Sequence, residues 1–474
     1  MSADTAWSAA QGGTVPAGRT APVGRTAPAD RTAPRGRIER IPGFRSASLG
    51  NERDLLVHLP PGYDDRPGVR YPVLYLHDGG QVFDQGQQPT WAVDRTLEAL
   101  YAEGLIPGLI AVAVPNAGAD RGVEYSHVAE YWRTPGTPLK GHRYESFLAE
   151  EVKPFVDARY RTRTGPEHTA LMGSSMGGLV TYHIAFRRPE VFGLAAVLSP
   201  FLTHVDPDGL GERVVHERYR RRGPHRIWLD IGGREGLIMA RPARELAGRL
   251  VDEAGYTSGA DLLYHEDPAA PHHESAWGPR ARHALLHLFG APSPVRSLTV
   301  EPEILLAPGE TWSAVNPVAV RADGVRYTAL EAGYRVERPG VADVSPHGGL
   351  LPLAAGRTAV TVRAHGLAAR TEVEVVPELP AHPVLEVTVT VPPGTPDDAP
   401  VMFGPLPCAP AGPGRFRGRL AVPRGTGFDG GISRGWGLDA VDADGRRVLH
   451  PLRVDRDTRL DLTVDRWHRP ADGI

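Results

Sequence analysis

A serine between two glycines carries the clearest chemical signal in this sequence. Residues 173–177 read Gly-Ser-Ser-Met-Gly, which is the pattern G-x-S-x-G with Ser175 at its centre. An apolar strand-like segment, Thr169–Met172, precedes the pattern, and a helix-like segment, Leu179–Arg187, follows it. A nucleophilic serine in a sharp strand-to-helix turn needs small neighbours because its own backbone is strained. The pattern predicts that Ser175 is a nucleophile and that the Met176 N–H, at the helix start, faces a developing oxyanion.

The residues that would activate this serine follow it in the chain. The pattern alone is also compatible with a glycine-rich connecting turn that has no chemistry. A serine hydroxyl needs a histidine to accept its proton, and the histidine needs a carboxylate to orient it. In α/β-hydrolases the acid and then the histidine come after the serine. Glu235 lies in a glycine-rich turn just after the predicted strand Arg226–Ile231, where such sheets place functional groups. Asp230, inside that strand, is the alternative acid.

Three histidines are candidates for the base. His265 belongs to the predicted strand Asp261–His265 and is most simply a half-buried packing residue. His272 and His273 lie in the loop before a predicted helix that ends at Phe289. A histidine in this loop completes the order serine, acid, histidine, which favours catalysis over a solvated loop residue.

Several separate blocks of this sequence resemble one known family. Together they are similar to serine esterases that include enterochelin esterases, esterase D-like hydrolases and feruloyl or acetyl-xylan esterases. The resemblance covers roughly residues 38–290. The blocks are LPPGYD at 59–64, YPVLYLHDGGQVFD at 71–84, the set Asn116, Arg121, Glu124 and Tyr125, and HHESAW at 272–277.

The resemblance implies an α/β-hydrolase fold and assigns roles to individual residues. It selects His272 rather than His273 as the base, and Glu235 fits the family's acid after a glycine-rich turn. One extra glycine in the second block leaves open which backbone N–H would assist Met176 in an oxyanion hole. The candidates are Gly79, Gly80 and Gln81.

Other residues of these blocks have both structural and functional interpretations. Asp78 is expected to anchor the oxyanion loop through local hydrogen bonds. Arg121 and Glu124 would either contact the substrate or form an internal ion pair near the mouth of the site. Trp277 is interpreted as a packing residue below the His272 loop, with a substrate platform as the alternative.

Length, charge and cysteine content limit the possible classes of protein. A chain of 474 residues is longer than one core usually sustains, so several domains are expected. The formal net charge of −3 indicates neither nucleic-acid nor membrane binding. Cys408 is the only cysteine, which rules out an intrachain disulfide and a thiolate metal site. No apolar run approaches the roughly 20 residues that a membrane span needs. We expect no metal and no cofactor.

Residues 1–37 form a Pro-, Ala-, Arg- and Thr-rich segment that repeats a short unit. Such a composition cannot bury enough apolar surface to offset the entropy of ordering, so a disordered tail is predicted. The segment has no apolar stretch typical of a signal peptide. The sequence as written therefore predicts a cytoplasmic protein, while its accessory modules would also fit an extracellular one.

The segment 38–292 alternates apolar strands with stretches of helix length. The strands include Val73–Leu76, Leu109–Val114 and Leu194–Ser199, and the helices include Ala92–Ala102 and Tyr144–Asp157. Near-continuous apolar strands that alternate with helices predict a mostly parallel, doubly wound sheet covered on both faces.

Two β-rich segments follow, and each predicts an all-β sandwich. Residues 293–377 contain short strands separated by turns and resemble bacterial immunoglobulin-like domains, which implies a spacer or docking module. Residues 378–474 resemble starch-binding-like β modules more distantly. Trp436 and Trp467 would either stack on a sugar or belong to the core.

We therefore expect a serine carboxylic-ester hydrolase that works through an acyl-enzyme. Its partner would be a small-molecule or saccharide ester, of the siderophore, feruloyl or acetyl-sugar type. Two alternatives are an acyltransferase that uses a sugar acceptor, and a carbohydrate- or surface-binding protein with a vestigial hydrolase domain. The sequence predicts neither the ester nor the oligomeric state.

Overall fold

The computed structural model describes most of the chain from residue 35 onward. The described residues are 35–86, 90–128, 138–205, 212–235, 237–308, 312–380, 382–404, 406–422, 424–428, 430–434, 438–443 and 445–468. Of the predicted N-terminal tail, residues 1–34 lie outside this set, and Trp436 also lies outside it. No helix within the described part of the chain is long and apolar enough to cross a membrane.

A mixed β-sheet forms the centre of the first part of the chain, residues 35–292. The spatial order of its first eight strands is β1-β2-β4-β3-β5-β6-β9-β10. The neighbours from β4 to β10 are parallel, whereas β2 is antiparallel to both β1 and β4. The strands are β1 (Arg37–Arg45), β2 (Glu52–Leu59), β3 (Val73–His77), β4 (Ile110–Val114), β5 (Thr169–Ser174), β6 (Leu194–Leu198), β9 (Arg226–Gly232) and β10 (Leu262–Asp267).

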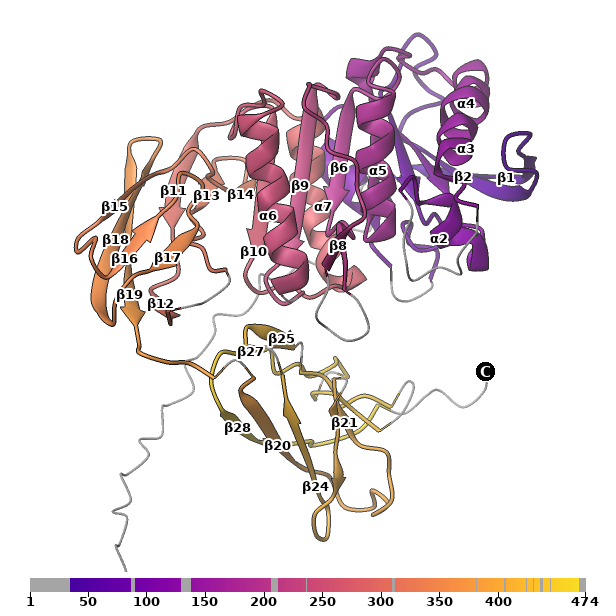
Figure 1. Cartoon of the computed structure of the whole chain (residues 1–474). Coiled ribbons are helices and arrows are strands. Elements are labelled where there is room, and N and C mark those ends of the chain that lie inside the picture. Colours follow the sequence, from indigo (N-terminus) through magenta and orange to yellow (C-terminus); the bar gives the residue numbers. More distant parts are fainter. Residues whose placement is uncertain are drawn as a thin grey trace, which may run out of the picture. The chain divides into compact units, whose positions relative to one another are not determined.

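Helices cover both faces of this sheet, as the alternating sequence predicts. One apolar core joins a sheet face to α3–α6 and the other joins the opposite face to α1 and α7. In Figure 1, α5 and α6 lie in front of the strands and α7 lies behind them. The helices are α1 (Val93–Ala102), α2 (Arg121–Glu124), α3 (Gly141–Ser146), α4 (Lys153–Arg159), α5 (Met176–Arg187), α6 (Leu237–Asp252) and α7 (Glu274–Phe289), with the short turns η1 (Gly118–Asp120) and η3 (Pro166–His168). The predicted α/β-hydrolase core is confirmed.

The helix expected at Tyr144–Asp157 is not regular throughout. A π-helical turn, η2 (Phe147–Val152), separates α3 from α4. Pro154, in the first turn of α4, has no N–H to donate to the carbonyl of the preceding turn.

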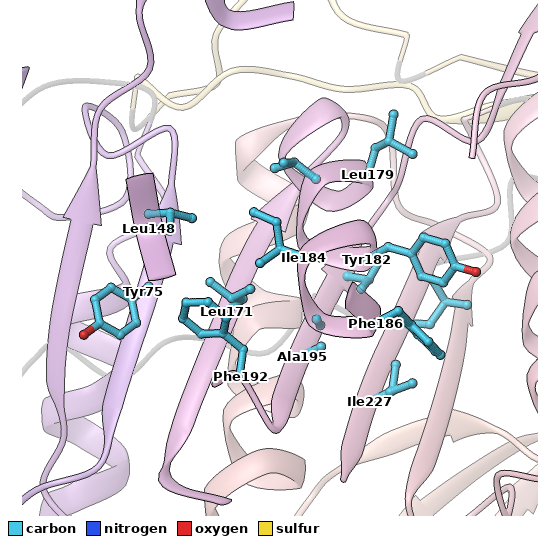
Figure 2. Packing of buried hydrophobic residues seen from close by; sticks show 14 of the residues in the cluster. Tyr75, Leu148, Leu171, Leu179, Tyr182, Ile184, Phe186, Phe192, Ala195 and Ile227 are labelled. Atoms are coloured by element: carbon cyan, nitrogen blue, oxygen red, sulfur yellow. The ribbon is translucent and has the colours of Figure 1, made fainter. Parts of the chain in front are cut away.

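Helix α5 is fixed on the sheet by apolar contacts. Figure 2 shows its side chains, among them Leu179 and Ile184, beside Leu171 of β5, Ala195 of β6 and Ile227 of β9. All five side chains are at most 1% exposed. Burial of each large aliphatic side chain stabilises the fold by about 1.5–3 kcal/mol. The N-terminus of α5 is therefore held firmly at the edge of the sheet where Ser175 lies.

The sheet does not end at residue 292, where a domain boundary was predicted. Strand β14 pairs antiparallel with β10 through Thr328 and Tyr264, and β13 and β11 extend the sheet further. A second sheet has the order β12-β19-β18-β15, and β16 pairs with β17. These strands are β11 (Val295–Thr299), β12 (Glu303–Leu306), β13 (Val318–Arg321), β14 (Arg326–Thr328), β15 (Gly333–Val336), β16 (Ala342–Val344), β17 (Leu350–Pro352), β18 (Gly356–Ala364) and β19 (Leu367–Val375).

The last part of the chain contains short strands around an apolar cluster of its own. Its main sheet has the order β23-β24-β20-β28, in which β20 is antiparallel to β24 and parallel to β28. These strands are β20 (Val384–Thr390), β23 (Ala409–Pro410), β24 (Arg415–Ala421) and β28 (Thr458–Thr463). The smaller strands of this segment are β21 (Met402–Phe403), β22 (Leu406–Pro407), β25 (Thr426–Phe428), β26 (Ile432–Ser433) and β27 (Leu452–Val454).

A separate pair of short strands lies in the first part of the chain, where β7 (Thr203–Val205) pairs with β8 (Glu212–Val214).

Candidate active site

Ser175 lies in the turn between β5 and α5 with a backbone conformation that few non-glycine residues adopt. Its φ is 58° and its ψ is −123°. The turn is so tight that a Cβ on Gly173 would lie 2.6 Å from the carbonyl oxygen of Gly177. A Cβ on Gly178 would lie 2.6 Å from the carbonyl oxygen of Leu198. Strain of this kind concentrates at functional sites, and here the glycine spacing seen in the sequence makes room for the tight turn.

The Met176 N–H lies at the first position of α5. The first N–H groups of a helix have no acceptor within the helix and carry its positive dipole end. The backbone of Ser175 is held on both sides, because its N–H donates to the Leu198 carbonyl at 3.1 Å and its carbonyl accepts the Phe201 N–H at 3.2 Å. The turn therefore presents a hydroxyl and a helix N-terminus at one point.

Glu235 and His272 form a direct hydrogen-bonded pair. His272 Nδ1 lies 2.8 Å from Glu235 Oε2. Glu235 follows β9 and His272 follows β10, so both residues lie at the sheet edge where Ser175 follows β5. The side chain of Glu235 is fully buried, whereas that of His272 is 35% exposed. A buried carboxylate and an accessible imidazole are the arrangement that a serine hydrolase needs.

His273 has a structural role that differs from the role of His272. It is the N-cap of α7, and its Nδ1 accepts the backbone N–H of Ser275 at 3.1 Å. This bond satisfies one of the free N–H groups at the helix start. The neighbouring histidine thus belongs to the helix cap, while His272 contacts the carboxylate.

Asp230, the alternative acid, contacts other groups. Its carboxylate accepts the Trp228 Nε1–H at 2.8 Å and the Ser199 N–H at 3.1 Å, and it lies 3.3 Å from the Arg280 guanidinium. Burial raises the pKa of Asp230 to about 6 although Arg280 opposes the shift. Within the described residues, the carboxylate that contacts His272 is that of Glu235.

The Glu235 carboxylate is ionised because its partners outweigh its burial. Burial raises its pKa, but the hydrogen bond with His272 and the charge of Arg280 lower it more, so that the pKa falls below the usual value. Two neighbouring carboxylates with opposite pKa shifts are typical of sites with separate roles for each.

Ser199 and Arg280 complete this arrangement, and the sequence analysis did not identify either of them. Ser199 Oγ donates to Glu235 Oε1 at 2.6 Å and accepts from Trp277 Nε1 at 3.0 Å and Arg280 Nη2 at 2.7 Å. With both acceptor positions of its hydroxyl filled, Ser199 can direct its O–H only to Glu235. The Gly232 N–H also donates to Glu235 Oε1, at 2.7 Å. Glu235 Oε1 thus accepts hydrogen bonds from Ser199 and Gly232, while Glu235 Oε2 contacts His272.

Two signals in the sequence could have identified these residues. Ser199 directly follows the apolar strand β6, in the position that Ser175 has after β5. Arg280 lies on α7 one helical turn after Trp277, on the face that is buried. A fully buried arginine requires a carboxylate partner, and two are present here.

Ser175 and His272, as described in this structure, are not hydrogen-bonded to each other. No hydrogen bond between them occurs among the described residues, although the Glu235–His272 contact is formed. In substrate-free enzymes such bonds are often long and tighten only in the complex with substrate.

Two N–H groups of the predicted oxyanion loop already have acceptors. The Gly79 N–H donates to the Val114 carbonyl at 3.0 Å, and the Gln81 N–H donates to the Asp78 carbonyl at 3.2 Å. A Cβ on Gly79 would lie 2.7 Å from the backbone nitrogen of Val114, so this position requires glycine. To bind an oxyanion, Gly79 or Gln81 would have to give up its present bond.

Asp78 is anchored by residues of the segment after β4, not by its own turn as predicted. Its carboxylate accepts from Asn116 Nδ2 at 2.7 Å and from Arg121 Nε and Nη2 at 2.6 and 2.7 Å. Its N–H donates to Tyr125 Oη at 3.2 Å. Of the two roles considered for Arg121, this geometry favours the internal ion pair.

Glu124 and Trp277 likewise have internal partners. Glu124 is fully buried, lies 3.0 Å from the Arg53 guanidinium and accepts from Asn51 Nδ2 at 2.8 Å, so it is placed for an ion pair instead of a substrate contact. Trp277 is 7% exposed and presents its ring nearly at right angles to His272, with 4.9 Å between ring centroids. It also packs against Trp91. These contacts favour the packing role for Trp277.

One group of side chains outside this site could hold a metal ion. His127, His142 and Glu145 bring their ligand atoms within 4.8 Å of one another. None of them contributes to the hydrogen bonds of Ser175, Glu235 or His272 given above.

The sequence matches one family and several curated relatives. Residues 46–288, slightly more than half of the chain, match the family Esterase, described as "Putative esterase". The Bacillus subtilis protein YbbA is 22% identical over 239 residues, which are 49% of this chain and 91% of YbbA. An endo-1,4-beta-xylanase/feruloyl esterase of Xylanibacter ruminicola is 29% identical over 167 residues, covering 35% of this chain and 22% of that protein.

A third relative acts on siderophores according to its name. The siderophore triacetylfusarinine C esterase of Aspergillus fumigatus is 26% identical over 172 residues, covering 34% of this chain and 56% of that protein. The chain therefore spans less than two thirds of the length of these two esterases. The family match itself covers the whole region between β2 and α7 in which the site residues lie. The chain belongs to the Esterase family, a family of carboxylic-ester hydrolases built on the α/β-hydrolase core.

Proposed function

We propose that this protein hydrolyses carboxylic esters with Ser175 as nucleophile, His272 as general base and Glu235 as the acid that orients His272. The observation that carries the proposal is the 2.8 Å contact between His272 and the buried Glu235, formed at the same sheet edge as the strained Ser175 turn. This geometry supplies the three chemical roles in the order typical of α/β-hydrolases.

The reaction would proceed through an acyl-enzyme. Ser175 Oγ attacks the ester carbonyl carbon while His272 Nε2 takes the hydroxyl proton, and the carbonyl oxygen becomes an oxyanion next to the Met176 N–H. When the C–O bond to the alcohol breaks, His272 returns the proton to the leaving alcohol. Water then attacks the acyl-enzyme with His272 again as base, which releases the acid and restores Ser175.

The oxyanion loop would need a fixed backbone to contribute to this step. Asp78, held by Arg121 and Asn116, lies next to the serine turn, because a Cβ on Gly177 would be 3.1 Å from Asp78 Oδ2. We assign Asp78 and Arg121 a positioning role for the Gly79–Gln81 loop.

The mechanism is tested by the burst kinetics of p-nitrophenyl acetate hydrolysis. Ser175→Ala should lose several orders of magnitude in kcat and fail to react with a fluorophosphonate probe. Ser174→Ala is a matched control, because this neighbouring serine is buried and lies within β5. Equal burst amplitudes in the wild type and Ser175→Ala would refute the assignment.

The names of the relatives suggest which esters to test first. We propose a feruloyl ester or a siderophore ester as the substrate, since two relatives are named for these activities. A panel of feruloyl, siderophore, acetyl-sugar and short-chain esters should show a clear preference in kcat/KM for one of the first two. Equal rates across the panel would contradict this substrate proposal without affecting the mechanism.

We also propose that the two C-terminal segments are accessory β modules without chemistry of their own. Within residues 295–375, strands β12, β15, β18 and β19 form a sheet of their own and β16 pairs with β17, while β11, β13 and β14 extend the main sheet. Residues 384–464 contribute a separate apolar cluster around Phe403 and Phe416. Trp467 is partly buried against that cluster, and its Nε1–H donates to Thr395 Oγ1 at 2.9 Å, which supports a structural role for it.

A further inference from the structure

A second cluster of chemically capable side chains lies beside the segment that anchors Asp78. His127 is in the loop after α2, and His142 and Glu145 are on α3. One ligand atom from each of the three residues lies within 4.8 Å of the others. Residues three apart on a helix share a face, so His142 and Glu145 can both turn toward His127.

His127 is the residue whose surroundings need an explanation. Its side chain is 0% exposed, and neither ring nitrogen has a hydrogen-bond partner within the described part of the chain. A buried polar group without a partner is costly, and in native proteins it commonly marks an ion or a water.

The spacing of the cluster agrees with metal coordination. Zn²⁺ binds imidazole nitrogens and carboxylate oxygens at about 2.0–2.2 Å, so that two ligands of a tetrahedral centre are roughly 3.3–3.5 Å apart. His127 Nε2 and Glu145 Oε2 are separated by 3.4 Å. The rings of His127 and His142 have centroids 5.0 Å apart and are nearly perpendicular, at 83°.

Glu145 is held in place by two arginines in the way that outer groups fix a metal ligand. Its Oε2 accepts from Arg187 Nε at 2.8 Å and its Oε1 accepts from Arg188 Nε at 2.7 Å. Arg187 also pairs with Glu217, and Arg188 also pairs with Glu150. Glu217 and Glu150 thus offset the positive charge that the two guanidiniums place beside Glu145. Partners of this kind orient a ligating carboxylate.

We propose that His127, His142 and Glu145 form a binding site for a divalent transition-metal ion, with Zn²⁺ as the ion that fits this donor set best. Two imidazoles and one carboxylate leave a fourth position, and His142 is exposed, so water would complete the coordination. The ion would join α3 to the loop after α2. That loop follows Arg121 and Tyr125, which hold Asp78. A bound ion would therefore restrict the movement of the segment that holds the oxyanion loop in place.

The proposal is tested on the full chain after treatment with EDTA and dialysis. Addition of Zn²⁺ should raise the Tm and leave one bound zinc per chain by elemental analysis. Co²⁺ should give the visible absorption of a tetrahedral or five-coordinate centre, and Mg²⁺ should give neither signal, because Mg²⁺ prefers all-oxygen sites.

The deciding variant is His142→Gln, because His142 is exposed and its loss should not disturb the core. Its affinity for Zn²⁺ should fall at least about tenfold, and the Co²⁺ absorption should disappear. His168→Gln is the matched control, since this partly exposed histidine lies next to a glutamate on η3, outside the cluster. Binding in His168→Gln should equal that of the wild type, and Ser175→Ala should also bind the ion.

Two results would overturn the metal site. One is a wild-type protein that binds no zinc and gives no Co²⁺ absorption. The other is equal zinc affinity in the wild type and His142→Gln. Either result would leave His127 and Glu145 as an ordinary buried imidazole–carboxylate contact, without bearing on the role of Ser175.

Discussion

Glu235 and Asp230 illustrate how neighbouring carboxylates acquire different properties from their partners. Glu235 accepts from Ser199 and from the Gly232 N–H and contacts His272, and its pKa lies below the usual value despite burial. Asp230 is equally buried, but burial dominates there and its pKa is raised to about 6. Arg280 lies close to both carboxylates, at 3.3 Å from Asp230 and 3.5 Å from Glu235. The Arg280 guanidinium is therefore shared between the two carboxylates.

We expect Ser199→Ala to change the pH dependence of catalysis. Without the Ser199 O–H, the Glu235 carboxylate keeps more negative charge on the oxygen that faces His272 and stabilises the imidazolium form more strongly. The acidic limb of the kcat/KM profile should then move to higher pH, and kcat should fall by about tenfold, the effect of roughly 1.4 kcal/mol. Values of kcat/KM determined from initial rates between pH 5 and 9 measure this shift.

A purely structural role for Ser199 would give a different result. It would lower the Tm and the amount of active enzyme without moving the acidic limb. Ser174→Ala, which alters a buried serine in β5, provides the comparison for any general loss of stability. An unchanged limb in Ser199→Ala would contradict the positioning role.

At the scale of the elements, the site depends on how closely three backbone segments approach one another. The β5–α5 turn, the end of β6 and the oxyanion loop meet around glycines whose missing side chains make room for carbonyl groups and for Asp78. Gly173, Gly177 and Gly79 have such neighbours, whereas a Cβ on Gly80 would meet nothing within 4 Å. Gly80 therefore has room for a side chain, whereas Gly173, Gly177 and Gly79 do not.

We expect Gly173→Ala to be strongly destabilising and Gly80→Ala to be tolerated. In the first variant the new Cβ would be 2.6 Å from a backbone oxygen and the turn would have to move, at a cost of at least about 1–3 kcal/mol. Urea denaturation should show a lower midpoint for Gly173→Ala together with loss of activity. For Gly80→Ala, the free energy of unfolding should stay within about 0.5 kcal/mol of the wild-type value. Equal stability of the two variants would contradict the close approach at the serine turn.

At the scale of the whole chain, the esterase region shares structure with the segment that follows it. Strand β14 continues the main sheet from β10, and one apolar core contains both Trp228 of β9 and Tyr327 of β14. The last segment, in contrast, has a core of its own. The three predicted domains are thus not equally independent.

Truncation should expose this difference. Deletion of residues 293–474 would leave the β10 edge unpaired and uncover part of a shared core, so we expect aggregation or a Tm at least several degrees lower. Deletion of residues 382–474 alone should leave a folded chain with unchanged p-nitrophenyl esterase activity. Size-exclusion chromatography and thermal denaturation of both proteins test this expectation. Equal behaviour of the two truncated chains would show that β11–β19 are dispensable for the esterase region.

The amino-acid sequence alone determined the local features of this protein. Apolar runs such as Val73–Leu76 and Leu194–Ser199 specify buried strands because they have no polar side to present to water. The glycines around Ser175 specify the tight turn, and the order Ser175, Glu235, His272 agrees with the chain order of the family. The first two signals depend on residues that are close in the sequence, and the third depends only on chain order, so that all three can be recognised without the fold.

Only the tertiary structure decided which side chains meet. It brings Glu235 rather than Asp230 to His272, uses His273 as a helix cap, and pairs Arg121 with Asp78. It also places Ser199 and Arg280 behind Glu235. Each of these contacts depends on side-chain directions at the ends of strands that are far apart in the sequence but adjacent in the sheet, and no local pattern encodes those directions.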